Sequence, residues 1–283
     1  MSPHKKTTAL IEASHCVLEG YRPMTLRQLY YQLVSLKVIE NVQASYDALG
    51  RALVNARKEG LIPWDWIEDR LRRPRSVPQW SDLADFAETA CRSYRRDVWE
   101  EQDIYLEAWL EKDALSGIFE AVLGPYGVTL NVGRGYDGWS SLYAASRRFG
   151  DRVGVQILYF GDFDPSGEDM VRSLGERLGF FECVPEIEKI AITQDDIVEH
   201  NLSPAPTKTT DRRREKFIAR HGDRCVELDA LPPEILEGRI RLEVEGRMDL
   251  EALTKVRKIE DKERAWLRRQ LREKKRRPGN VLR

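Results

Sequence analysis

The sequence predicts an α/β protein with a parallel sheet, and three observations support this fold class. Runs of β-forming residues alternate with helical patterns between residues 104 and 192, as is typical of parallel sheets with right-handed crossovers. The run at 153–160 is an apolar stretch typical of a buried strand. Two aspartates, Asp162 and Asp164, follow it directly. Because ligands bind at the carboxyl ends of such strands, we expect a functional site there.

The elements of the predicted sheet domain follow a regular order along the chain. We expect strands at 104–110, 129–132, 153–160 and 188–192. We expect helices at 112–123, at 165–178 and from the glycine-rich loop 133–138 to Phe149. The resulting sheet is of the open, Rossmann-like kind.

Three amphipathic helices are predicted ahead of this domain, at 7–19, 26–36 and from about 45 to 60. The second begins with a capping box formed by Thr25 and Gln28. An extended stretch, 61–67, follows the third helix, and this order matches a winged helix whose third helix enters a DNA groove. The cations expected to contact phosphates there are Arg51, Arg57 and Lys58. A helical bundle without a nucleic-acid role is the alternative.

A basic, proline-broken stretch at 70–79 separates the two predicted domains. Its arginines expected to contact DNA are Arg72, Arg73 and Arg75. Ser81 is the predicted cap of a connecting helix that runs to about Trp99. We therefore divide the chain into a winged-helix domain at 1–78, an α/β domain with its connecting helix at 79–232 and a helical, basic C-terminal segment at 233–283.

Three carboxylates are predicted to meet at the carboxyl edge of the sheet. Glu111 follows the first strand as Asp162 and Asp164 follow a later one, and these junctions share one edge of a parallel sheet. Carboxylates held together favour a divalent cation, most simply Mg²⁺ (or Mn²⁺). The alternative for the aspartate pair is a helix-capping Asp164 beside a solvated Asp162. Lys112 and Arg134 are placed to neutralise phosphate or nearby carboxylates.

Composition limits the partners and the compartment. Residues 1–80 carry twelve Lys and Arg against eight Asp and Glu, and residues 262–283 carry ten against two, which leaves a net charge of −13 on 81–261. An acidic centre between basic ends fits a metal-using core with polyanion-binding arms, and solvated charge explains it almost as well. The four cysteines are widely spaced and indicate neither a zinc site nor a disulfide framework. No run is apolar enough for a membrane span or a signal peptide, so we expect a cytoplasmic protein.

Two motifs together resemble one protein family. Glu-Lys-Asp-Ala-Leu at 111–115, with Asp-Phe-Asp-Pro-Ser-Gly at 162–167, looks like the Toprim domain of the topoisomerase VI A subunit and its meiotic double-strand-break relatives. Thr25-Leu-Arg-Gln-Leu-Tyr-Tyr31 is similar to the Arg-x-x-Tyr-Tyr segment of that family's winged-helix domain. Glu227-Leu-Asp-Ala-Leu231 weakly resembles an acidic segment near the family's C-terminus. The arrangement also resembles the Toprim nuclease subunits of SMC-like plasmid-defence systems.

The resemblance implies metal-dependent DNA strand cleavage. In the topoisomerase branch the second tyrosine of the pair is the nucleophile, which falls on Tyr31, whereas the nuclease branch uses water. The alternative role for Tyr31 is that of a core aromatic, and the lack of a strand-passage partner in the chain favours hydrolysis.

The resemblance also bears on partners. It suggests a homodimer, because one active site cuts one strand, and a second subunit could supply the metal site that Tyr31 must reach. No P-loop is present, so an ATP-coupled step would need an ATPase partner subunit. The alternative of a different class is a non-catalytic DNA-binding or recombination accessory protein, whose acids are structural or bind a regulatory metal.

Overall fold

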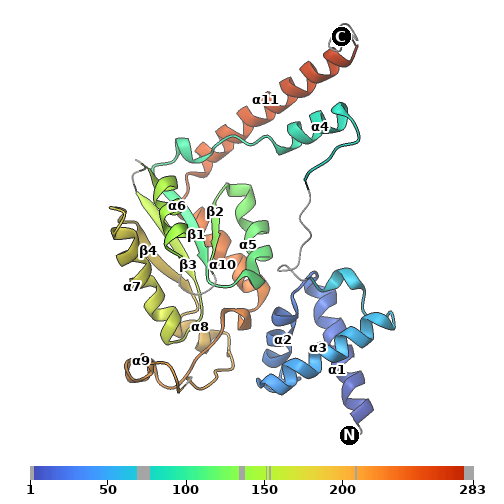
Figure 1. Ribbon diagram of the computed structural model, residues 1–283, viewed down its shortest axis with the longest axis vertical. Coiled ribbons are helices and arrows are strands. Elements are labelled where there is room, and N and C mark those ends of the chain that lie inside the picture. The colour runs from blue at the N-terminus through green and yellow to red at the C-terminus, as the bar shows by residue number, and fades with distance from the viewer. Residues whose placement is uncertain are drawn as a thin grey trace.

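A four-stranded, all-parallel sheet forms the centre of the protein, which is described by a computed structural model (Figure 1). The structure describes residues 3–68, 77–133, 138–150, 152, 154–207 and 209–276, with side chains from Lys6 to Leu271. The strand order is β2-β1-β3-β4. The strands are β1 (Tyr105–Leu110), β2 (Thr129–Val132), β3 (Val155–Phe160) and β4 (Glu186–Ala191). The prediction of an α/β fold with a parallel sheet is therefore confirmed.

Helices cover both faces of the sheet. The helices α5 (Ser116–Leu123) and α10 (Pro233–Glu245) pack against each other on one face. On the other side of the sheet, α6 (Trp139–Phe149) contacts α7 (Pro165–Gly179) (Figure 1). The predicted domain boundary at 232/233 would separate α10 from the α/β domain. In the structure α10 packs against α5 of that domain, and the chain leaves the sheet only after α10.

The register of the two central strands decides where the functional groups lie. Leu110 at the end of β1 pairs with Phe160 at the end of β3, and both side chains are buried. The apolar character of these strands reflects burial on both faces, as in other parallel sheets. Glu111 and Asp162 follow the paired strand ends and therefore share the carboxyl edge of the sheet.

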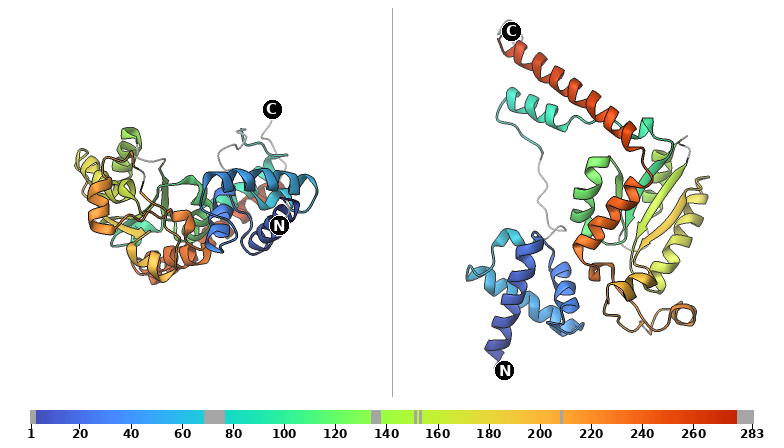
Figure 2. Two further views of the ribbon diagram at one scale, coloured as in Figure 1. Left: turned by 90° about the horizontal axis from the view of Figure 1, so that it is seen from below. Right: turned by 180° about the vertical axis from the view of Figure 1, so that it is seen from behind.

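The N-terminal unit contains α1 (Pro3–Tyr21), α2 (Leu26–Ser35) and α3 (Gln43–Lys58). The predicted capping box of α2 is present. After α3 the chain forms a 3-10 turn, Trp64–Trp66, and a single bridge from Ile67 back to Met24. The described part of this unit, which ends at residue 68, contains no β-hairpin that could serve as a wing. Figures 1 and 2 show the unit beside the carboxyl edge of the sheet.

Two helices form an arm at the opposite end of the molecule, where α4 (Leu83–Ser93) lies along α11 (Leu250–Arg276) (Figure 2). Tyr94 and Arg96 both bond Glu263, at 2.7 and 2.8 Å. The prediction for α4 was partly wrong. Its cap is Asp82, which accepts from the amide of Asp85, and the helix ends at Ser93 because Tyr94 is already extended.

Several short elements were not predicted, because each is too short to show a period. They are the helices α8 (Gln194–Glu199) and α9 (Arg214–His221) and the 3-10 turns Trp99–Glu101, Asp113–Leu115, Gly124–Tyr126 and Leu228–Ala230. None of the helices in the described part of the chain is long and apolar enough to cross a membrane.

Gly167, in the first turn of α7, has no room for a side chain. A Cβ at this position would lie 2.1 Å from the carbonyl oxygen of Asp162, whereas a Cβ at Gly238, inside α10, would meet nothing within 4 Å. We expect Gly167→Ala to lower the free energy of unfolding by about 1–3 kcal/mol. The matched Gly238→Ala should raise it by about 0.5–1 kcal/mol. Urea unfolding measures both, and a Gly167→Ala protein as stable as the wild type would contradict this packing.

Candidate functional site

Glu111 and Asp162 touch at the carboxyl edge of the sheet. The Glu111 amide donates to the Phe160 carbonyl at 2.9 Å, which fixes the backbone at the end of β1. The Glu111 Oε2 atom accepts from the amide of Asp162 at 3.0 Å and from the Tyr159 hydroxyl at 3.4 Å. The prediction that the two strand ends bring these acids together is confirmed in the structure.

Asp162 is a buried ion-pair partner and not a solvated carboxylate. Its side chain is 9% exposed. Its Oδ1 atom accepts from the amide of Leu228 at 2.9 Å, and its Oδ2 atom lies 2.6 Å from the Lys112 ammonium. Both oxygens of Asp162 therefore have partners from other segments of the chain.

Asp164 caps α7, as the capping alternative predicted. Its Oδ1 atom accepts from the amide of Gly167 at 2.7 Å, and Pro165 occupies the first helical position. The two aspartates thus differ in their roles in the fold, although they are only two residues apart.

A cluster of five charged side chains joins the N-terminal unit to the sheet domain, and we call it the charge cluster. Its members are Arg27, Lys112, Asp162, Glu227 and Asp229. The Lys112 ammonium lies 2.6 Å from Asp162, 2.8 Å from Glu227 and 3.6 Å from Asp229. Arg27, on α2, pairs with Glu227 and lies 3.5 Å from Asp229.

The electrostatics of the charge cluster keep Lys112 and Glu227 ionised. Burial alone would lower the pKa of Lys112, but Asp162, Asp229 and Glu227 together raise it above its usual range. Burial alone would raise the pKa of Glu227, but Lys112 and Arg27 outweigh it and lower the pKa to about 2. These residues therefore form a true ion-pair network at neutral pH.

Glu111 and Asp162, at the same edge, both have raised pKa values. Burial and then the charge of Asp162 raise the pKa of Glu111, and Asp164 adds to the rise. Burial also raises the pKa of Asp162, by more than Lys112 lowers it. Buried carboxylates that repel one another in this way are stabilised by any additional cation.

Tyr31 and its neighbour Tyr30 occupy different environments. The Tyr30 hydroxyl bonds Asn41 at 3.1 Å and the carbonyl of Val42 at 3.2 Å, all within the N-terminal unit. The Tyr31 side chain instead lines a cavity together with Glu227 of the charge cluster. Burial and the charge of Glu227 raise the pKa of Tyr31 well above its usual range, so the phenol keeps its proton.

A cavity of about 380 Å³ brings the predicted chemical groups together. The predicted site residues among its lining residues are Tyr31, Glu111, Lys112, Asp162 and Asp164. They belong to two structural units of one chain. A second subunit, which we expected to supply the metal site to Tyr31, is therefore not needed to bring Tyr31 to the acids. The homodimer stays a prediction.

The acids of the cavity suit a hard divalent cation in their chemistry. Glu111, Asp162 and Asp164 supply only oxygen ligands, which Mg²⁺ and Mn²⁺ prefer. The raised pKa of Glu111 shows a carboxylate that such an ion would stabilise. Within the described residues, no three His, Cys, Asp or Glu side chains are grouped so that they could hold a metal ion. The Lys112 ammonium is the cation at Asp162 in this arrangement.

The predicted DNA-contacting cations fall into four groups. Arg51 and Lys58 are exposed on α3, as a docking helix requires. Arg57 is engaged within its own unit, where its guanidinium lies over the Trp64 ring at 4.2 Å and donates to the Trp64 carbonyl at 2.7 Å. Lys112 belongs to the charge cluster. The remaining predicted cations lie outside the described residues: Arg72, Arg73, Arg75 and Arg134.

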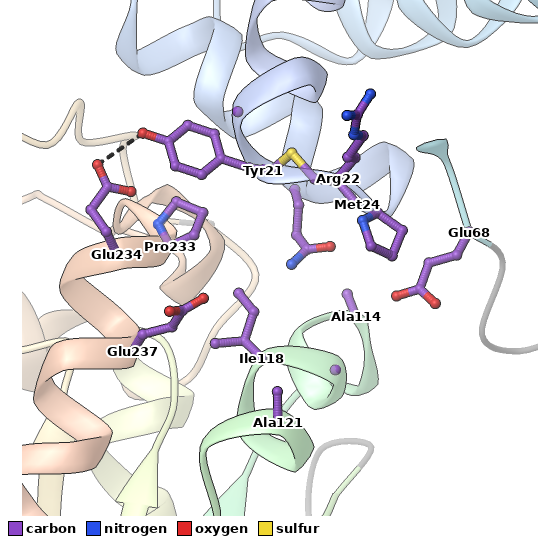
Figure 3. A pocket seen from close by; sticks show the side chains of 14 residues that line it. Tyr21, Arg22, Met24, Glu68, Ala114, Ile118, Ala121, Pro233, Glu234 and Glu237 are labelled. Atoms are coloured by element: carbon purple, nitrogen blue, oxygen red, sulfur yellow. Dashed lines mark hydrogen bonds between the residues drawn. The ribbon is translucent and has the colours of Figure 1, made fainter. Parts of the chain in front are cut away.

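A second cavity, of about 430 Å³, lies between the N-terminal unit, α5 and α10 (Figure 3). Figure 3 shows the Tyr21 hydroxyl directed at Glu234, which it contacts at 3.0 Å. Acidic residues, Glu68 and Glu237 among them, line this space. None of the predicted site residues lines it. Although it is the larger cavity, we assign the chemistry to the first one, where Tyr31 and the acids with raised pKa values lie.

Sequence reasoning missed three members of the charge cluster as site residues: Arg27, Glu227 and Asp229. Arg27 is the arginine of the Arg-x-x-Tyr-Tyr segment, and Glu227 and Asp229 belong to the Glu-Leu-Asp stretch. Both segments carry the family resemblance, and this resemblance is the signal in the sequence that could identify these residues. Their mutual contact spans 200 residues of sequence, and no local pattern reports it.

No protein-family model matches this chain, and no curated protein is recognisably similar to it. The resemblance to Toprim proteins therefore rests on the motifs, and the geometry of the site carries the functional argument.

Arg27 links the N-terminal unit to the sheet domain through the charge cluster, so its removal should weaken this attachment. Arg27→Ala leaves Glu227 and Asp229 with Lys112 as their cation in the cluster, so we expect the free energy of unfolding to fall by about 1–3 kcal/mol. This is less than for a fully buried pair, because the Arg27 side chain is 42% exposed. Hydrogen exchange of α2 and of residues 227–231 should accelerate.

The control is Arg51→Ala, on the exposed side of α3, with an expected change in the free energy of unfolding within about 0.5 kcal/mol. Equal effects of the two variants would contradict the role of Arg27.

Proposed function

We propose that this protein is a metal-dependent DNA-cleaving enzyme whose site is the 380 Å³ cavity at the carboxyl edge of the sheet. The observation that carries the proposal is the meeting of Tyr31 with Glu111, Asp162 and Asp164 in one cavity of one chain. Several carboxylates that could hold a cation, next to a tyrosine hydroxyl, suit phosphoryl transfer. In that reaction a bound cation stabilises the charge of the transition state and a positioned nucleophile attacks phosphorus. The motif resemblance to Toprim proteins supports the same reaction.

Glu111, Asp162 and Asp164 are the residues that would hold Mg²⁺ or Mn²⁺. When bound, the ion would offset negative charge on the scissile phosphate. Lys112 would then serve as a second positive charge in the cavity, because its raised pKa keeps it protonated. The Glu111 carboxylate is held in place by the Asp162 amide.

We assign Tyr31 the role of nucleophile, because it lines the same cavity as the three acids. In the proposed step, the Tyr31 oxygen forms a bond to phosphorus while the bond to one deoxyribose oxygen breaks. The phenol proton passes to solvent, because Glu227, whose pKa is lowered to about 2, is too weak a base to accept it. The leaving oxygen takes a proton from solvent, and the protein remains joined to the DNA end. Hydrolysis by water is the competing mechanism.

DNA docking is proposed for the N-terminal unit, with α3 as the groove-binding helix of a winged-helix-like domain. The exposed Arg51 and Lys58 support this proposal. A homodimer would cut both strands, and an ATPase subunit would be needed for any coupling to ATP.

A non-catalytic DNA-binding role is a second candidate, and one observation favours it. Lys112 already neutralises Asp162 at 2.6 Å, and Asp164 already caps α7. In this alternative the acids stabilise the fold and no strand is cut. The two variant series below separate the candidates.

The first series tests the acids. We expect Glu111→Gln and Asp162→Asn to reduce nicking of supercoiled plasmid by at least about a hundredfold in the presence of Mg²⁺, as for lost metal ligands, and Asp164→Asn to do the same. The metal-free melting temperature should hold or rise in Glu111→Gln, because neutralisation relieves repulsion, and should fall in Asp162→Asn, which leaves Lys112 less well paired. The control is Glu186→Gln, at an exposed position in β4. Wild-type cleavage by all three variants would place the site elsewhere.

The second series tests the nucleophile. Tyr31→Phe should abolish cleavage and remove the covalent protein–DNA adduct seen when wild-type reactions are denatured. Tyr30→Phe is the matched control. It loses hydrogen bonds within the N-terminal unit, at a cost of about 1 kcal/mol, and should keep the adduct. Cleavage by Tyr31→Phe, with no adduct in the wild type, would establish hydrolysis instead.

A further inference from the structure

The outward face of α11 carries a row of cations. The α-helical repeat of about 100° per residue places six side chains within a sector of about 100°, and all six are exposed. This outward face consists of Lys255, Lys258, Ile259, Lys262, Trp266 and Arg269.

The opposite face of α11 holds the helix to the rest of the protein. Val256 and Glu260 are buried there. Glu260 bonds Arg257 at 2.7 Å, pairs with Arg264 and accepts from the amide of Arg96 at 2.9 Å. The acidic side chains Glu260 and Glu263 therefore bond the segment that follows α4, on the inner side of α11.

The cations on the two faces of α11 differ in whether they form ion pairs. On the inner side Arg257 and Arg264 pair with Glu260, and Arg268 lies 3.3 Å from Glu88. The four cations of the outward face form no ion pair with any side chain that the structure describes. The outward face also contains no acidic residue between positions 255 and 269. Its positive charge is therefore directed at solvent.

We propose that the outward face of α11 binds the phosphate backbone of double-stranded DNA. This inference rests on the proposed function, because it assigns a second contact for the same substrate. The face from Lys255 to Arg269 spans about 21 Å at 1.5 Å per residue, a length over which duplex DNA presents about a dozen phosphates. Figures 1 and 2 show that α11 projects from the end of the sheet domain opposite the N-terminal unit, so the contact is separate from the cutting site.

The composition of the face favours DNA over a membrane surface. Helices that lie in a lipid interface bury a broad apolar face. Here only Ile259 and Trp266 are apolar, and the cations stand between them. Such a surface contributes salt-dependent affinity without reading sequence. It would hold a duplex while the site engages one phosphate.

The test compares two variants with the same loss of charge, in full-length protein without divalent metal. The first replaces Lys255, Lys258, Lys262 and Arg269 with Gln. The second replaces four exposed cations on other helices, Arg92, Arg147, Lys216 and Arg220, with Gln. Fluorescence anisotropy with a labelled linear duplex, longer than α11, gives Kd over a series of salt concentrations. Circular dichroism and thermal unfolding establish that both variants are folded.

We expect the α11 variant to bind at least about tenfold more weakly at physiological salt, with its salt slope reduced by about 3–4, as for four lost phosphate contacts. The control variant should bind like the wild type. Equal affinities and slopes for the two variants would overturn the α11 proposal while leaving DNA binding by the wild type, and so the proposed function, in place.

A wild type with no affinity for DNA would overturn both proposals together. Vesicles of equal parts phosphatidylserine and phosphatidylcholine serve as the second ligand. Vesicle binding that depends on the α11 cations, with unchanged affinity for DNA, would assign the face to a lipid surface and overturn the inference.

Discussion

The burial of the Lys112 ammonium is the constraint on which the site depends. A buried cation is tolerated only with paired carboxylates around it, and Lys112, with its side chain 18% exposed, finds Asp162, Glu227 and Asp229. These partners come from distant parts of the chain, so satisfying one charge brings two segments of the sheet domain together. Arg27 then attaches the N-terminal unit to the same carboxylates. The charge cluster is therefore part of both the candidate site and the interface between the units.

The same constraint leaves the cavity short of positive charge. Among the described residues, six carboxylates lie at this edge, Glu111, Asp164 and Asp211 in addition to the three of the charge cluster. Against them stand the cations Arg27 and Lys112, and Arg213, which pairs with Asp211. Local structure uses one oxygen of Asp164, while Glu111 stays buried beside Asp162 with a raised pKa. This imbalance is the physical basis for proposing a divalent cation. Tyr31 lines the cavity with the acids, whereas Tyr30 bonds within its own unit, and this contrast is the basis for proposing a nucleophile.

The arm uses charge in a different way. Along α11, Glu260 and Glu263 lie where the helix packs, and there they pair with inner-face arginines and with Arg96. The outward cations form no ion pair with the described side chains, which is the basis for proposing a DNA contact there. A long helix with 3.6 residues per turn can separate these functions because its faces do not mix. The protein thus has buried, paired charge at one end of the sheet and unpaired, exposed charge at the other.

The sequence by itself determined the parallel sheet, the capping box at Thr25, the cap at Asp164 and the convergence of Glu111 with Asp162, because each depends on residues a few positions apart or on the shared edge of parallel strands. It did not determine the partner of Asp162, the contact of Arg27 with Glu227 or the end of α4. Ion pairs across 200 residues leave no periodic signal, and neither does the extended backbone of Tyr94, at which α4 ends. Only the tertiary structure decided that Tyr31 and the acids share one cavity within one chain, because that depends on how the N-terminal unit packs against the sheet domain over a buried charge.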